Sequence, residues 1–155
     1  MVCLHTAGSD GRMYRHQLCD PDISANFRTI VFDVPRHGKS LPPAGWHLEE
    51  DEYKLTTSFY AEFIVEFCRA LELHKPVIMG QSMGGNICLE LALRYENEFS
   101  ALIAMEACDY SPGWWIDQLH HPEIHGGEAV ATSVFGLMSP ESPDEYRWET
   151  WWYYA

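Results

Sequence analysis

The sequence predicts an α/β fold, in which a mostly parallel sheet is flanked by helices. Four short apolar runs have the length of buried parallel strands, and each is followed by polar residues, glycine or proline. Segments with helical periodicity alternate with these runs, and such alternation is typical of parallel α/β proteins. The predicted strands are residues 2–5, 29–33, 76–80 and 101–107, and the predicted helices are residues 11–18, 58–73 and 84–95.

The helix predicted over residues 58–73 is supported by its apolar spacing. Tyr60, Ile64, Phe67 and Leu71 recur at helical intervals and therefore share one face. We expect that face to pack on the sheet.

The last third of the chain has a different character. It is rich in proline and tryptophan, and two further helices are predicted there, over residues 127–137 and from Pro143 towards the C-terminus. Ser142 is the expected N-cap of the second of these helices. We therefore predict a core over residues 1–109 and a second part over residues 110–155.

The chain is acidic, and it is apolar enough to form a core. Its 155 residues carry a formal net charge of −13, and 46% of them are hydrophobic. A negative charge of this size repels phosphate backbones and anionic lipid surfaces, so neither a nucleic acid nor a membrane is an expected partner. The acidic run at residues 49–52 is expected to be an exposed loop.

The N-terminus lacks a basic segment followed by an apolar stretch, and no apolar run approaches the ~18 residues needed to span a bilayer. The five cysteines show no Cys-x-x-Cys spacing, and we expect reduced, structural thiols. A cytoplasmic location follows as an expectation.

The most informative motif joins a predicted strand to a predicted helix. Residues 80–84 read Gly-Gln-Ser-Met-Gly, and this context is that of a nucleophile elbow. The sharp turn strains the backbone of the serine and leaves no room for side chains two residues before and after it. Glycine is therefore needed at both positions, and Gly80 and Gly84 occupy them. Ser82 is therefore the predicted nucleophile of a serine hydrolase. The alternative is a turn serine with no chemistry.

Three motifs in order resemble those of the α/β-hydrolase superfamily. Residues 4–9 resemble the His-Gly loop after the family's third strand, residues 32–40 resemble its Asp-x-Pro-Gly-His-Gly-x-Ser loop after the fourth, and residues 80–84 match the elbow after the fifth. Thr6 and Arg36 stand where the family more often has glycine. The resemblance implies a partial α/β-hydrolase fold with strand order 4-3-5-6 in the family's numbering.

The resemblance also implies site residues and a substrate class. The oxyanion hole would consist of the backbone N–H groups of Ala7 and Met83. Family members that act on halides or epoxides carry aspartate at the elbow, so Ser82 implies acyl transfer through a serine ester. The implied substrates are small molecules with an ester, lactone, thioester or activated C–C bond, and neither a cofactor nor a metal is implied.

The acid and base of the mechanism are harder to place. In the family the acid usually follows the seventh strand and the histidine follows the eighth, whereas this sequence resembles strands three to six. We therefore expect a chain truncated at both ends, with the usual acid and base missing. Asp109 lies just beyond the last predicted strand, where some family members carry the acid, and it is the candidate acid here.

For the histidines, the leading interpretation is a structural or solvent-exposed side chain and not a catalytic one. For His5 the resemblance implies a role in supporting its loop, and the alternative for both His5 and His37 is the base of the mechanism. The group after Ser82 is expected to face solvent or to pack within the second part, and the alternatives are a base that folds over the serine and a metal site. That group consists of His120, His121 and His125, with Glu123 among them.

The second part resembles the start of a helical cap. Its tryptophans and tyrosines suit an aromatic roof over an apolar pocket, which implies an apolar or aromatic substrate. Packing of the cap on itself is the alternative. For the whole chain, the competing function is an inactive fragment or a module that binds a small apolar ligand. Both outer strands are expected to be unpaired, so self-association through the sheet edges is expected.

Overall fold

The computed structural model describes residues 1–42, 44–45, 55–110 and 126–155. The chain divides into two compact units, Met1–Asp109 and Tyr110–Ala155. The acidic run at residues 49–52 lies outside the described residues.

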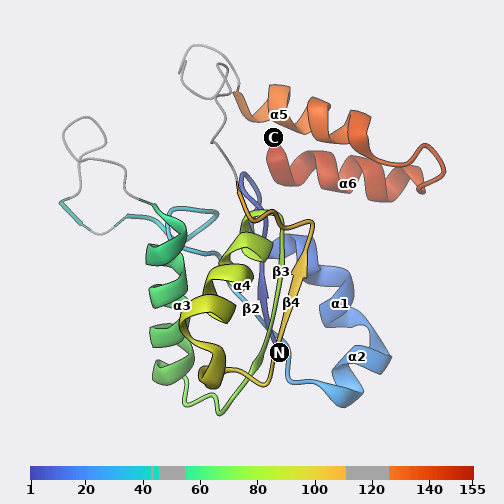
Figure 1. Ribbon diagram of the computed structural model, residues 1–155. Helices are drawn as coiled ribbons and strands as arrows, with labels where there is room; N and C mark the ends of the chain where they lie inside the picture. Colours follow the sequence, from blue (N-terminus) through green and yellow to red (C-terminus); the bar gives the residue numbers. More distant parts are fainter. Residues whose placement is uncertain (43, 46–54, 111–125) are drawn as a thin grey trace. The chain divides into compact units, whose positions relative to one another are not determined.

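The first unit is built on a parallel four-stranded sheet (Figure 1). Its strands are β1 (Val2–Leu4), β2 (Ile30–Val31), β3 (Val77–Gln81) and β4 (Ala101–Met105), in the spatial order β2-β1-β3-β4. This confirms the predicted α/β class and the predicted strand order. The observed strands are shorter than the predicted ones or differ by a residue at their ends, as strand boundaries commonly do.

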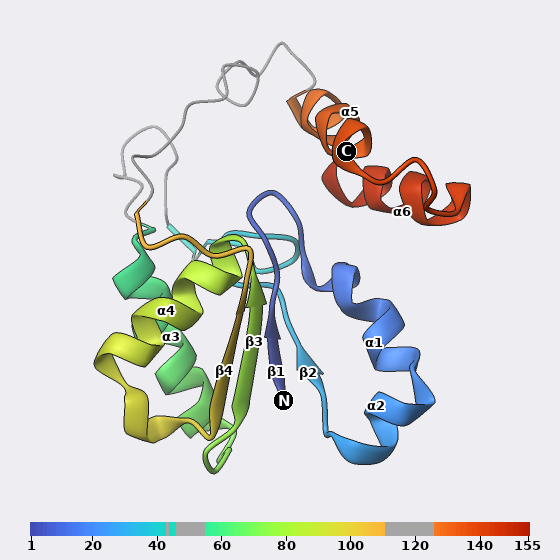
Figure 2. The same ribbon diagram turned by 45° about the vertical axis from the view of Figure 1, so that its right-hand side comes forward.

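Helices cover both faces of the sheet (Figure 2). On one face lie η1 (Gly11–Tyr14), α1 (Arg15–Cys19) and α2 (Pro21–Asn26), and on the other lie α3 (Thr57–Ala70) and α4 (Met83–Arg94), which is followed by η2 (Glu96–Glu98).

The helix predicted over residues 11–18 is divided between η1 and α1, and α2 was not predicted. The N-terminus of α2 nevertheless carries residues that are typical of a helix start. The Asp20 carboxylate accepts hydrogen bonds from the backbone N–H groups of Asp22 and Ile23, both at 2.9 Å, and Pro21 occupies the first helical position.

The core of the first unit lies mainly between the sheet and the pair α3 and α4. Of the face predicted for α3, Tyr60 and Ile64 are buried and Phe67 is partly buried, whereas Leu71, at the C-cap, is 42% exposed. Completely or almost completely buried side chains from both strands and helices form the centre: Val2, Leu4, Ile64, Ile78, Ile87 and Leu91.

All five cysteines lie in described residues and none forms a disulfide, as predicted. Cys3, Cys68 and Cys88 are buried, whereas Cys19 and Cys108 are exposed. Burial raises the pKa of Cys3 and Cys68 to about 11 and that of Cys88 to about 12, so these three thiols stay protonated at neutral pH.

The described part of the second unit contains two helices, α5 (Gly126–Leu137) and α6 (Asp144–Tyr154), which pack against each other. The predicted cap at Ser142 is wrong: Pro143 occupies the N-cap position and no side chain caps the helix. Pro143 has a ψ of 140°, which is extended and not helical, so the helix begins one residue later than expected.

Aromatic residues join the two helices of this unit. The rings of Phe135 and Trp148 lie 4.9 Å apart, and the Arg147 guanidinium lies 4.2 Å from the centre of the Phe135 ring. The Trp151 indole N–H donates to the Thr132 hydroxyl at 3.3 Å. The aromatic side chains therefore contact one another within the unit, and the proposed roof over Ser82 stays a prediction.

Within the described residues, no helix is both long and apolar enough to cross a bilayer.

Candidate active site

Ser82 lies at the junction of β3 and α4, with φ 52° and ψ −111°. This left-handed conformation is unusual for a residue with a Cβ and costs roughly 1–3 kcal/mol, so the surrounding structure has to hold it. Ser82 occupies the N-cap position of α4, but its hydroxyl makes no capping hydrogen bond. The side chain is half-buried at the carboxyl edge of the sheet.

The two glycines of the motif allow close contact around the serine. A Cβ at Gly80 would clash with the backbone of Gly84. A Cβ at Gly84 would clash with the carbonyl of Leu4, its distance to the carbonyl carbon being 2.9 Å. The first turn of α4 can therefore lie directly on β1, with Ser82 at the top of the turn.

The loop after β1 reaches the same edge of the sheet. Leu4 pairs with Gly80 in register, so the following residues leave the sheet beside the serine turn. Ala7 and Gly8 are exposed there. Met83 begins α4, and the first-turn N–H groups of a helix have no partner within the helix. These positions suit backbone donors to an oxyanion, and their assignment stays a prediction.

His5 is completely buried, and both of its ring nitrogens contact backbone. Nε2 accepts a hydrogen bond from the Val34 N–H at 3.0 Å, so Nδ1 carries the proton that it donates to the Thr6 carbonyl at 2.9 Å. Burial lowers the pKa of His5 below its usual 6.5. The ring holds the loops after β1 and β2 together, as expected, and it has no nitrogen left for a proton transfer.

Asp33 connects η1 to the loop after β2. Its carboxylate accepts hydrogen bonds from the backbone N–H groups of Gly11 and Lys39, both at 2.8 Å. Its backbone carbonyl accepts from the Ser40 hydroxyl at 2.6 Å. The motif over residues 32–40 therefore folds onto the chain that follows the first loop.

The departures from the family pattern differ in their structural consequence. Arg36 has φ 67°, in the region that favours glycine, so arginine is strained there. Thr6 does not have a positive φ and needs no glycine.

The end of β4 and the residues after it contact the serine turn through several hydrogen bonds. The Ser82 N–H donates to the Met105 carbonyl at 2.9 Å, and the Gln81 amide donates to the Glu106 carboxylate at 2.6 Å. The Cys108 N–H donates to the side-chain carbonyl of Asn86 at 2.9 Å. Sequence reasoning missed Glu106 and Asn86, because neither belongs to a motif and their partners, Gln81 and Cys108, lie 25 and 22 positions away in the sequence.

Asp109, the candidate acid, is exposed just after these contacts. His37 is half-buried, and its Nδ1 lies 3.1 Å from the Pro35 carbonyl oxygen. The other candidate residues, His120, His121, Glu123 and His125, lie outside the described residues. Among the described residues, no group of His, Cys, Asp and Glu side chains is suited to hold a metal ion.

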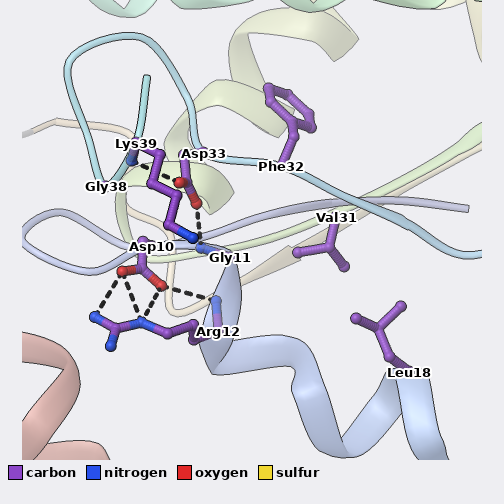
Figure 3. A pocket seen from close by; sticks show the side chains of 9 residues that line it. All are labelled: Asp10, Gly11, Arg12, Leu18, Val31, Phe32, Asp33, Gly38 and Lys39. Atoms are coloured by element: carbon purple, nitrogen blue, oxygen red, sulfur yellow. Dashed lines mark hydrogen bonds and ion pairs between the residues drawn. The ribbon is translucent and has the colours of Figure 1, made fainter. Parts of the chain in front are cut away.

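A cavity of about 670 Å³ lies beside β2 (Figure 3). The side chains of Leu18, Val31 and Phe32 form its apolar wall. Its polar wall contains the Asp10–Arg12 ion pair. The Asp33 carboxylate, which accepts hydrogen bonds from the N–H groups of Gly11 and Lys39, also lies in the polar wall. Ser82, Ala7 and Met83 do not line it.

Comparison with known proteins gives a family match and several relatives. The family model described as "alpha/beta hydrolase fold" matches residues 1–127. A protein of Mycobacterium phage D29 named as a non-heme haloperoxidase is 27% identical over 135 residues, which are 87% of this chain and 42% of that protein. The magnesium-chelatase 30 kDa subunit of Rhodobacter capsulatus is 33% identical over 93 residues, 60% of this chain and 30% of that subunit.

Solved structures show the same fold at lower sequence identity. The enol-lactonase of Burkholderia xenovorans LB400 matches with a TM-score of 0.79 and 19% identity, covering 99% of this chain and 57% of that one. A hydrolase from Pseudomonas aeruginosa PA01 matches with a TM-score of 0.70 and 20% identity, over the same shares of the two chains. The chain thus spans little more than half the length of these structures and less than half the length of the curated relatives.

Proposed function

Because the chain belongs to the α/β-hydrolase fold family, we propose that it hydrolyses ester-like bonds of small molecules through an acyl intermediate on Ser82. The observation that carries this proposal is the strained, uncapped serine at the N-terminus of α4. A hydroxyl in that position meets the positive end of the helix dipole and unpaired N–H groups, which favour developing negative charge.

The reaction would proceed in two stages. The Ser82 oxygen forms a bond to the substrate carbonyl carbon while a base accepts the hydroxyl proton. The N–H groups of Met83 and Ala7 stabilise the resulting oxyanion, and each such donor typically contributes ~2.7–4 kcal/mol. The bond to the leaving group then breaks, the leaving group takes the proton, and water releases the acyl group from Ser82.

The base is not His5, because both of its nitrogens are bonded to backbone. We propose Asp109 as the acid that orients the base, since it follows β4 at the edge of the sheet that carries Ser82. We also propose that residues 110–155 form a cap whose aromatic side chains select apolar or aromatic substrates. These steps need no cofactor.

One observation favours a second candidate function. The cavity beside β2 has an apolar wall and does not include Ser82. A chain of this family without hydrolase activity could bind a small apolar ligand there.

The two functions are separated by hydrolysis of a panel of short- and long-chain p-nitrophenyl esters. The hydrolase proposal predicts turnover that Ser82→Ala abolishes, whereas Ser100→Ala, a change at an exposed serine outside the site, retains it. Equal turnover by wild type and Ser82→Ala would contradict the hydrolase proposal. The binding function would be supported by a folded sample that hydrolyses none of the esters but binds an apolar dye, provided that the esters displace the dye.

A further inference from the structure

Two residues with left-handed backbone lie side by side at the carboxyl edge of the sheet. Ser82 has φ 52° and Glu106 has φ 50°. They follow β3 and β4 directly, and Gln81 pairs with Met105 in register, so they occupy matching positions on neighbouring strands. A conformation of this kind persists only where the surroundings hold it, and here two such residues have to be held together.

Hydrogen bonds connect the two strained segments on both flanks of Ser82. Gln81 precedes the serine, and its amide donates to the Glu106 carboxylate at 2.6 Å, a charge-assisted bond. Asn86 follows in the first turn of α4 and accepts the Cys108 N–H at 2.9 Å. The Ser82 N–H itself donates to the Met105 carbonyl.

The backbone packing leaves little freedom for this arrangement to change. A Cβ at Gly85 would lie 2.6 Å from the Met105 carbonyl oxygen, so the first turn of α4 contacts the end of β4 directly. A loss of the side-chain bonds would therefore act on the orientation of the turn and not on a loose surface loop.

We propose that Gln81, Asn86 and Glu106 form an elbow clamp, a set of positioning residues that holds the Ser82 backbone in its left-handed conformation for nucleophilic attack. This inference rests on the proposed function, since it gives Ser82 the role of nucleophile. The clamp residues contact the serine turn and the end of β4 and need not contact substrate. Their effect is on the rate of attack, because small displacements of a nucleophile reduce reactivity strongly.

The first test is the second-order rate constant for labelling by a fluorophosphonate. We expect Gln81→Ala and Glu106→Ala each to lower it roughly tenfold or more, and the double variant to be no slower than the slower single variant, because both changes remove one interaction. Glu106→Gln keeps an acceptor oxygen for Gln81 and should remain within about twofold of wild type. Glu98→Ala, which removes the exposed ion pair with Arg69, is the control and should not change the rate.

The second test does not depend on reactivity. Hydrogen exchange at the amides of Ser82 and Cys108 should be slow in wild type and faster in Glu106→Ala and Asn86→Ala, at unchanged global stability by urea denaturation. The two tests can also give different answers. If these amides lose protection in the variants but the fluorophosphonate does not label wild type, the clamp is upheld and the proposed function is rejected. Wild-type labelling rates in the alanine variants would overturn the clamp. Slower labelling without faster exchange at Ser82 would also overturn it.

Discussion

At the scale of single residues, backbone strain and candidate chemistry coincide at Ser82. The strain is tolerated because Gly80 and Gly84 allow close backbone contact and because the Ser82 N–H is bonded to β4. A serine in an ordinary turn could adopt a relaxed conformation at no cost. The geometry therefore favours a role for the hydroxyl that a structural turn would not require.

His5 carries a pH-dependent part of the stability. Its pKa in the folded protein is lowered from 6.5, mainly by burial, and protonation of Nε2 would break the bond from Val34. The unfolded chain binds this proton more readily, so the contribution of His5 is complete above about pH 6.5 and declines as the pH falls below that value. We expect the free energy of unfolding to fall as the pH is lowered from 7.5 to 5.5.

This expectation is tested by urea denaturation at several pH values, together with NMR titration of the histidine ring protons. His5→Gln should flatten the decline, whereas the same change at exposed His74 should leave the wild-type slope. A measured pKa of His5 at or above 6.5 would contradict the account.

At the scale of elements, α3 ends in a Schellman motif in which Glu72 occupies the C′ position, where glycine is usual. The Leu73 N–H donates to the Cys68 carbonyl at 2.9 Å and the Glu72 N–H to the Arg69 carbonyl at 3.0 Å. Glu72 has φ 53°, where glycine is preferred. We expect Glu72→Gly to increase the free energy of unfolding by about 0.5–1 kcal/mol, as measured by urea denaturation.

The same substitution within the helix provides the matched control. Glu62 lies on the exposed face of α3, and Glu62→Gly should lower the stability by about 1 kcal/mol. If both variants were destabilised equally, the left-handed conformation of Glu72 would not be the source of the effect.

The elements that could be predicted from sequence are those with strong local patterns. β3 and α4 follow from an apolar run, a glycine-rich turn and a helical repeat in direct succession. The short helix α2 was missed because it buries no side chain and has no apolar repeat, although Asp20 and Pro21 mark its start. Its existence depends on capping more than on packing.

The candidate site was predictable only in part, for a related reason. Ser82, Gly80 and Gly84 belong to a continuous motif, so local sequence indicates them. The contact between Gln81 and Glu106 joins residues 25 positions apart, and only the register of β3 with β4 brings them together. Pairing of that kind leaves no local signal in the sequence.

At the scale of the whole molecule, the first unit has two outer strands, and β4 is the more exposed. Among the described residues β4 pairs only with β3, carries no charged side chain, and leaves Ile103 42% exposed. An apolar edge of this kind favours pairing with another strand, while the net charge of −13 opposes self-association at low salt.

We therefore expect concentration-dependent association that increases with salt, observed by sedimentation velocity. Ile103→Lys should reduce it, because lysine on an edge strand disfavours pairing. Leu93→Lys places the same charge at an apolar residue of α4 that is 81% exposed, and it should associate like wild type. Equal association of both variants would exclude β4 as the interface.

The most direct test of the central claim is the mass of the protein after treatment with a fluorophosphonate, followed by peptide mapping. An activated Ser82 predicts a single adduct on the peptide that contains it, and no adduct in Ser82→Ala. An adduct on another residue, or none on a folded wild-type sample, would contradict the assignment of Ser82 as the nucleophile.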